Sequence, residues 1–263
     1  MNRIEKKFSE LKRQNRKAFC VFITCGDPNL EITKRLIIEF DRIGVDLIEL
    51  GLPFSDPLAD GPVIQRASER ALKNKINPDR AFNLVRDLRK KIKDIPLCLL
   101  TYYNLVFCYP ERLFLKEAKE AGIDGLIIPD LPVEEAKDSI RESKKLDLDI
   151  IFFLSPMSSL KRIKLISKAS EGFIYYVSLT GVTGEREELS EDLTRNILLI
   201  KKFTKKPVCV GFGISKKWQV EKVSEISDGV IIGSAIVRKI EENLGRKDLI
   251  ERVINFTKSL MTR

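Results

Sequence analysis

Glu49 is the side chain whose type and setting most directly indicate acid or base chemistry. It lies inside the apolar run 46–50, and because side chains alternate along a strand it shares a face with Leu47. A carboxylate buried in a strand is costly unless it has a partner or a task, and burial raises its pKa toward neutrality. This suits a general acid or base, whereas a structural ion pair with a lysine inside the fold is the alternative that strand context leaves open.

Asp60 is the second carboxylate of interest, in a loop rich in Pro, Gly and Asp. It precedes Gly61 and Pro62, and Pro62 is suited to the first position of a helix. Asp60 is therefore either a catalytic carboxylate or a residue that caps this helix. Asp56 in the same loop is typical of a turn. The chain has no histidine, so proton chemistry must fall to Asp, Glu, Lys, Tyr or Cys.

Three glycine-containing loops, at 181–184, 211–215 and 233–235, follow the last three strand-like runs. Glycines let backbone N–H groups approach a phosphate closely, and a helix beginning at Ser234 would direct its positive end to the same point. Together the loops predict a phosphate site, although each glycine alone is also an ordinary turn residue. The polar, glycine-bearing segment 178–190 is predicted to be a lid over the site, with a plain surface loop as the alternative.

The elements that must position these residues are eight short apolar runs, at 18–25, 45–50, 96–101, 124–129, 148–154, 172–177, 207–211 and 228–233. Amphipathic stretches with helical spacing separate them, which predicts strands alternating with helices and hence a parallel sheet. Eight such units without a break in composition favour closure into an α/β (β/α)₈ TIM barrel. Residues 1–263 are then one domain, whose site lies at the carboxyl ends of the strands.

Additional helices are expected around this minimal barrel. A charged helix at 2–15 precedes the first strand, helices beginning at Pro62 and near Pro78 enlarge the second β/α unit, and a helix at 246–260 ends the chain.

Charge and composition narrow the class of protein. The formal net charge is +9, but the lysines alternate with glutamates along helical stretches and no nucleic-acid motif is present, so solvated helix surfaces are expected. No apolar run is long enough to cross a bilayer, and the N-terminal segment is charged throughout, which predicts a cytoplasmic protein. The five cysteines are odd in number and form no CxxC, so free and mostly buried thiols are expected.

Several motifs, in order along nearly the whole chain, resemble the alpha subunit family of tryptophan synthase. They lie at 24–28, 49–57, 60–65, 129–132, 181–184 and 211–215, and the pair ELGLPFSDP and DGPVIQ is the most specific. The resemblance implies retro-aldol cleavage of indole-3-glycerol phosphate to indole and glyceraldehyde 3-phosphate. It also implies pairing with a beta subunit that carries pyridoxal phosphate, in an α₂β₂ heterotetramer, and no cofactor or metal in this chain.

The resemblance assigns Glu49 as the acid/base and Asp60 as the second catalytic carboxylate. Glu49 would protonate indole C3 and take a proton from the substrate hydroxyl, while Asp60 would stabilise the charge that develops at the indole N–H. Thr183 would orient Asp60. The expected phosphate ligands are the backbone amides of Gly184, Gly213, Gly233 and Ser234. The expected indole contacts, for which barrel packing is the alternative, are Phe22, Leu100, Ile127, Tyr175 and Phe212.

The sequence departs from the family pattern at two positions, with Cys25 where alanine is usual and Leu179 where arginine is frequent. Leu179 bears on lid closure and on communication with a partner. Two alternatives remain: another phosphate-binding barrel, such as a sugar-phosphate epimerase or a thiamine-phosphate-type synthase, and a degenerate barrel that binds ligand and activates its partner. The loop 49–65 argues against the first, and the presence of both Glu49 and Asp60 against the second.

Overall fold

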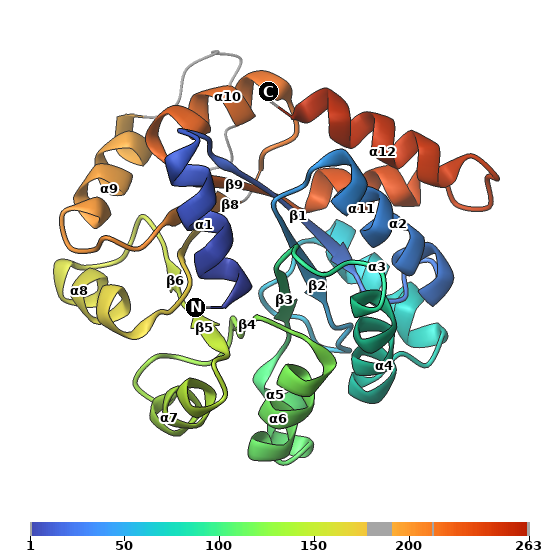
Figure 1. Ribbon diagram of the computed structural model, residues 1–263, viewed down its shortest axis with the longest axis horizontal. Helices are drawn as coiled ribbons and strands as arrows, with labels where there is room; N and C mark the ends of the chain where they lie inside the picture. Colours follow the sequence, from blue (N-terminus) through green and yellow to red (C-terminus); the bar gives the residue numbers. More distant parts are fainter. Residues whose placement is uncertain (1, 178–190, 212, 262–263) are drawn as a thin grey trace.

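The computed structural model of the chain describes residues 2–177, 191–211 and 213–261. Within these residues the strands form one parallel sheet with the order β5-β4-β3-β2-β1-β9-β8-β7-β6. The strands curve around a common centre and the helices surround them (Figure 1). The strands are β1 Ala18–Thr24, β2 Leu47–Gly51, β3 Leu97–Leu100, β4 Gly125–Ile127, β5 Asp149–Ile151, β6 Phe153–Leu154, β7 Ile174–Val177, β8 Val208–Gly211 and β9 Gly229–Ile232.

The barrel closes through the segment that the sequence predicts as its fifth strand. This segment is interrupted at Phe152, which separates β5 from β6. β5 pairs with β4, and β6 pairs with β7 on the other side. At the break, the Phe152 carbonyl accepts a hydrogen bond from the Tyr175 N–H at 3.2 Å. The predicted TIM barrel is therefore confirmed, and its eight strand positions contain nine strands because one position divides its pairing between two neighbours.

The expected additional helices are present, and two of them are shorter than predicted. α3 begins at Pro62 and α4 at Pro78, as predicted, whereas the first helix spans only Arg3–Arg13. The last helix begins at Leu249, after a turn in which Arg246 and Asp248 form an ion pair (2.9 Å). The helices are α1 Arg3–Arg13, α2 Leu30–Ile43, α3 Pro62–Lys73, α4 Pro78–Arg89, α5 Tyr103–Cys108, α6 Glu111–Ala121, α7 Lys137–Lys145, α8 Leu160–Ala169, α9 Glu191–Lys201, α10 Lys217–Ile226, α11 Ser234–Glu241 and α12 Leu249–Leu260.

Both faces of the strands are buried, which explains why the strand sequences are apolar without interruption. On β2, Ile48 and Leu50 pack outward in the cluster that joins the sheet to the surrounding helices. Leu47 belongs to the second cluster, which fills the barrel interior. The alternation of a strand therefore directs Glu49 inward, on the face that it shares with Leu47.

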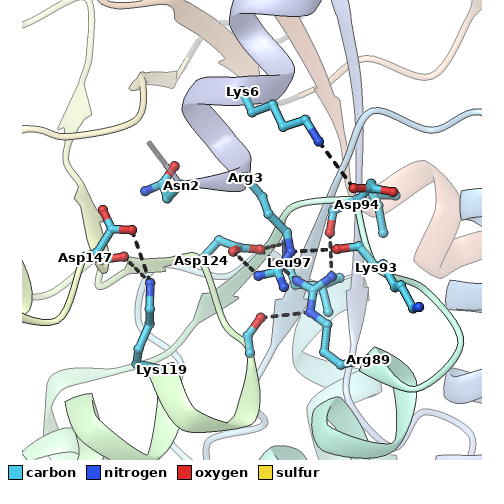
Figure 2. A network of polar contacts seen from close by, with 12 residues as sticks. Asn2, Arg3, Lys6, Arg89, Lys93, Asp94, Leu97, Lys119, Asp124 and Asp147 are labelled. Atoms are coloured by element: carbon cyan, nitrogen blue, oxygen red, sulfur yellow. Dashed lines mark hydrogen bonds and ion pairs between the residues drawn. The ribbon is translucent and has the colours of Figure 1, made fainter.

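The amino-terminal end of the barrel is closed by α1, which crosses the centre of the view in Figure 1. Its residues Ile4, Phe8 and Leu11 are buried against the interior cluster. Figure 2 shows the polar contacts beside it, where Asp124 accepts hydrogen bonds from Arg3 (2.8 Å) and Arg89 (2.7 Å). Asp124 also accepts the backbone N–H of Leu97 at 2.9 Å. At this end of the barrel, apolar side chains are therefore closely packed and the charge of Asp124 is paired with two arginines.

Two further expectations concern membranes and thiols. None of the helices in the described part of the chain has the length and apolar composition needed to cross a bilayer. All five cysteines are free, and all except Cys108 are buried. The thiols of the four buried cysteines therefore contribute to packing.

Candidate active site

A cavity of about 370 Å³ opens at the carboxyl ends of the strands. This is the end of a TIM barrel at which active sites are built. The lining combines two carboxylates, one arginine, aromatic and aliphatic side chains, and the loops that follow β8 and β9. The lining residues are Phe22, Glu49, Asp60, Ile64, Leu100, Tyr175, Gly213, Ile214, Ser215, Ile231, Gly233, Ser234, Ala235 and Arg238.

Glu49 is buried completely in this wall. It stands on β2 in register with Phe22 on β1 and with Cys98 on β3. Neither of its carboxylate oxygens has a hydrogen-bond partner within the described residues, so the structural ion pair considered above is not formed there. Burial raises the pKa of Glu49 from 4.5 to about 8. At neutral pH the side chain is therefore mainly protonated and able to donate a proton.

Asp60 follows the same strand but has a different environment. The N-cap of α3 is Gly61, and it makes no side-chain cap, so the interpretation of Asp60 as a capping residue is wrong. Burial raises the pKa of Asp60 to about 6, and a hydrogen bond from the Tyr102 hydroxyl opposes this rise. The same hydroxyl accepts the N–H of Ala59 at 3.0 Å, which ties the loop to the end of β3. Asp60 is accordingly ionised at neutral pH.

The two carboxyl groups thus differ in charge although they line one cavity. Glu49 carries its proton at pH 7, whereas Asp60 has lost its own. Environments that separate the pKa values of two neighbouring acids assign one of them to proton donation and the other to electrostatic stabilisation. The cavity is therefore equipped for a reaction in which a neutral group is protonated while positive charge develops nearby.

The part of the cavity wall formed by the start of α11 is suited to an anion. α11 begins at Ser234 after Gly233, which provides no side-chain cap, so the N–H groups of Ser234 and Ala235 have no partner within the helix. α10 differs, because Gln219 accepts the N–H groups of Ser215 (2.8 Å) and Lys216 (3.0 Å) at its start. The start of α11 therefore offers donors and a positive dipole end to a phosphate.

Two glycines make room for the aromatic rings that line the cavity. A Cβ atom at Gly51 would lie 2.5 Å from the Phe22 ring, and one at Gly211 would lie 2.6 Å from the Tyr175 hydroxyl oxygen. Such distances are far shorter than carbon atoms tolerate. Glycine at these strand ends therefore lets both rings lie across the barrel mouth, where a flat apolar ligand group can be held between them.

The cavity brings together most of the site residues predicted from the sequence. Glu49, Asp60, Phe22, Leu100, Tyr175, Gly213, Gly233 and Ser234 all line it. Ile127 does not. It is fully buried in the interior cluster, because its strand position directs it among neighbouring core side chains. Thr183, Gly184, Phe212 and Leu179 lie outside the described residues.

Sequence reasoning missed Tyr102, Ile64 and Arg238. Nothing local in the sequence connects Tyr102 to Asp60, because their contact depends on the pairing of β2 with β3. Ile64 and Arg238 carried a usable signal, because each lies within about one helical turn of a predicted site residue, Asp60 or Ser234.

Together the barrel and its cavity define a class of protein, a phosphate-binding TIM-barrel enzyme with two carboxylates at the end of β2. Comparison with known proteins identifies the member of this class. The family model described as tryptophan synthase alpha chain matches residues 8–262. The tryptophan synthase alpha chain of Thermoanaerobacter sp. (strain X514) is 45% identical over 260 residues, which cover 99% of this chain and 98% of that one.

A second relative and a solved structure agree. The tryptophan synthase alpha chain of Methanocaldococcus jannaschii is 46% identical over 249 residues, covering 95% of this chain and 88% of that one. The crystal structure of tryptophan synthase subunit alpha from Legionella pneumophila str. Paris has a TM-score of 0.92 at 39% identity, covering 99% and 97% of the two chains. The chain therefore belongs to the tryptophan synthase alpha chain family.

Membership gives the chain the alpha-chain step of tryptophan biosynthesis, the cleavage of indole-3-glycerol phosphate. The enzyme is a carbon–carbon lyase, as the sequence motifs implied. The alternative of an epimerase or a thiamine-phosphate-type synthase is wrong, because the match covers almost the entire chain.

Proposed function

We propose that Glu49 and Asp60 divide the chemistry of indole-3-glycerol phosphate cleavage between them. The Glu49 carboxyl donates its proton to indole C3, which leaves the ring as an indolenine cation able to accept electrons. The resulting carboxylate takes the proton of the substrate hydroxyl while the carbon–carbon bond breaks, so that indole and an aldehyde are released and Glu49 is reprotonated. Asp60 remains ionised and stabilises the positive charge at the indole N–H.

The observation that carries this proposal is the isolation of Glu49. A fully buried carboxyl group without a hydrogen-bond partner in the described residues is expensive for the fold. It also lines the same cavity as Gly233 and Ser234 at the start of α11. A proton donor held at this position therefore borders a ligand whose phosphate is bound at the start of that helix.

The rest of the site supports binding of the two ends of the substrate. We propose that backbone N–H groups of Gly213, Gly233 and Ser234 bind the phosphate, and that Phe22, Leu100 and Tyr175 enclose the indole. The cavity of about 370 Å³ is within the range of small-molecule sites. Gly184 at the phosphate, Phe212 at the indole and Thr183 beside Asp60 stay predictions from the sequence.

The direct test is indole release from indole-3-glycerol phosphate, with and without a beta subunit. We expect Glu49→Gln to lower the rate by about 10³-fold or more, because the amide cannot transfer the proton. Binding of glycerol 3-phosphate should change less than about twofold, since the phosphate end is untouched. A Glu49→Gln enzyme that turned over at the normal rate would remove Glu49 from the mechanism. Wild-type protein that bound ligand but released no indole would instead indicate a barrel that only activates its partner.

We also propose that the chain acts with a beta subunit in an α₂β₂ assembly, and that pyridoxal phosphate belongs to that subunit, with no cofactor in this one. The solved structure concerning the α₂β₂ tryptophan synthase complex of Pyrococcus furiosus has a TM-score of 0.86 and 36% identity to this chain. Leu58, Phe107 and Met157 are 92%, 69% and 83% exposed, and all three follow strand ends on the cavity side. Exposed apolar side chains gathered at one end support a protein partner there.

Two further proposals concern the chain as a whole. We propose that residues 1–263 fold as one TIM-barrel domain, since one apolar cluster extends from Phe19 to Leu260. We also propose a cytoplasmic location, which is supported by free thiols at all five cysteines.

A further inference from the structure

Arg238 is the one positively charged side chain among the described residues that line the cavity. It lies in the last turn of α11, four residues after Ser234, with which the helix begins. Residues four apart lie on one face of a helix, and their side chains incline toward its amino terminus. The long arginine side chain is therefore directed along the helix face toward the N–H groups of Ser234 and Ala235.

The guanidinium group of Arg238 is not engaged in the fold. It is exposed and forms no ion pair or side-chain hydrogen bond within the described part of the chain. The arginines of the adjacent helix α3 behave differently, because Arg66 and Arg70 both bind Glu241 at the end of α11, each at 2.7 Å. Glu241 thus neutralises arginines outside the cavity and leaves Arg238 with its charge available.

The charges in the cavity show what Arg238 can contribute. The substrate phosphate brings about two negative charges, and Asp60 adds another when ionised. Backbone N–H groups carry only partial charges, so the phosphate wall otherwise has no full positive charge among the described residues. A guanidinium group supplies that charge, and its planar fork matches two phosphate oxygens.

We infer that Arg238 binds the substrate phosphate through its side chain and thereby selects phosphorylated substrates. This inference rests on the proposed function, since it adds a side-chain ligand to the backbone phosphate site. Arg238 then acts on the binding of a group that does not react, and not on the proton transfer at Glu49.

The test compares Arg238→Met and Arg238→Lys with Lys239→Met as the matched control. Lys239 is the next residue on α11, but it pairs with Glu242 at 3.3 Å and does not line the cavity. Calorimetry with glycerol 3-phosphate should give a dissociation constant about tenfold higher for Arg238→Met and about threefold higher for Arg238→Lys. Lys239→Met should stay within about twofold of the wild type.

Kinetics and a phosphate-free ligand separate this role from a structural one. For Arg238→Met we expect KM to rise about tenfold while kcat stays within about twofold, because the side chain binds a group that does not react. Binding of indole-3-glycerol, which lacks the phosphate, should not change. Added salt should weaken glycerol 3-phosphate binding more in the wild type than in the variant.

Two results would overturn the inference. One is wild-type affinity of Arg238→Met for glycerol 3-phosphate, and the other is an equal loss of affinity for indole-3-glycerol. In either case indole release by the wild type would leave the proposed function intact. Conversely, a wild-type enzyme that released no indole would sink the proposed function whatever Arg238 does to phosphate binding.

Discussion

The two ends of the barrel treat a buried carboxylate in opposite ways. At the amino-terminal end, Asp124 is 1% exposed and is bound by Arg3, Arg89 and a backbone N–H. At the carboxyl end, Glu49 is 0% exposed and has no hydrogen-bond partner in the described residues. Asp149 lies between these cases, because it is at the amino-terminal end but its Oδ2 has no partner and burial raises its pKa to about 7.

This difference distinguishes a carboxylate that holds the fold together from one that costs stability. Asp124 connects α1, α4 and the start of β3, so its charge is compensated where the chain is packed. Ionisation of Glu49 would carry the full desolvation cost of a buried charge, so the side chain keeps its proton, which is the property that proton donation needs. The carboxylate that stabilises the fold and the one that serves chemistry therefore lie at opposite ends of the barrel. Substitutions at the two ends should have opposite effects on the free energy of unfolding and on indole release.

The largest effect is expected at Glu49. Its pKa is about 8 in the folded chain against an ordinary value of 4.5, so the folded state binds the proton more tightly than the unfolded state. The free energy of unfolding therefore decreases as pH rises from 4.5 to 8, by about 1.4 kcal/mol per pH unit. Glu49→Gln cannot ionise, and at pH 9 we expect it to be about 5 kcal/mol more stable than the wild type.

Urea denaturation of both proteins at pH 6 and pH 9 measures this difference. The gain in stability should be larger at pH 9 and should accompany the loss of indole release. A variant less stable than the wild type at both pH values would show that Glu49 has a stabilising partner, and the contrast between the two ends would fail.

Asp124→Asn should have the reverse effect, a loss of stability with little change in activity. Removal of this carboxylate leaves Arg89 buried without its partner, and we expect a loss of about 3–5 kcal/mol in the free energy of unfolding. In the folded protein kcat/KM for indole release should stay within about twofold, since the cavity is at the other end. Urea denaturation and steady-state kinetics measure the two quantities. A drop in kcat/KM without a loss of stability would contradict the division of roles.

The smallest effect is expected at Tyr102, whose hydrogen bond lowers the pKa of Asp60 and so adds to the difference from Glu49 that burial creates. Activity should decline below about pH 6 as Asp60 becomes protonated, and above about pH 8 as Glu49 ionises. Tyr102→Phe removes the hydroxyl that lowers the pKa of Asp60, so the acidic side of the profile should move to higher pH. We expect kcat/KM to fall about threefold to tenfold at pH 6 and to recover partly at pH 7.5.

The matched control for Tyr102 is Tyr103→Phe. The Tyr103 hydroxyl contacts Glu111 at 3.4 Å and does not line the cavity, so the pH profile of this variant should match that of the wild type. Equal profiles for Tyr102→Phe and the wild type would show that the hydroxyl does not control the ionisation of Asp60.

Much of the scaffold could be predicted from local patterns. The apolar runs located every strand position, and α3 begins at Pro62 as the fixed φ of proline favours. The alternation of β2 placed Glu49 on the interior face, and the start of α11 at Ser234 followed from its glycine and the helical pattern. Such patterns involve residues that are near one another in sequence, so they can be evaluated without knowledge of the fold.

Tertiary structure decided the relations that depend on assembly of the barrel. Pairing of β2 with β3 brings Tyr102, at the end of β3, to the loop after β2, and the folded loop makes Gly61 rather than Asp60 the N-cap of α3. Assembly of the barrel likewise buries Ile127 in the interior cluster, although the sequence placed it beside the indole. The charge state of each carboxylate depends on which donors come within hydrogen-bond distance after folding, and residue spacing along the chain does not contain that information.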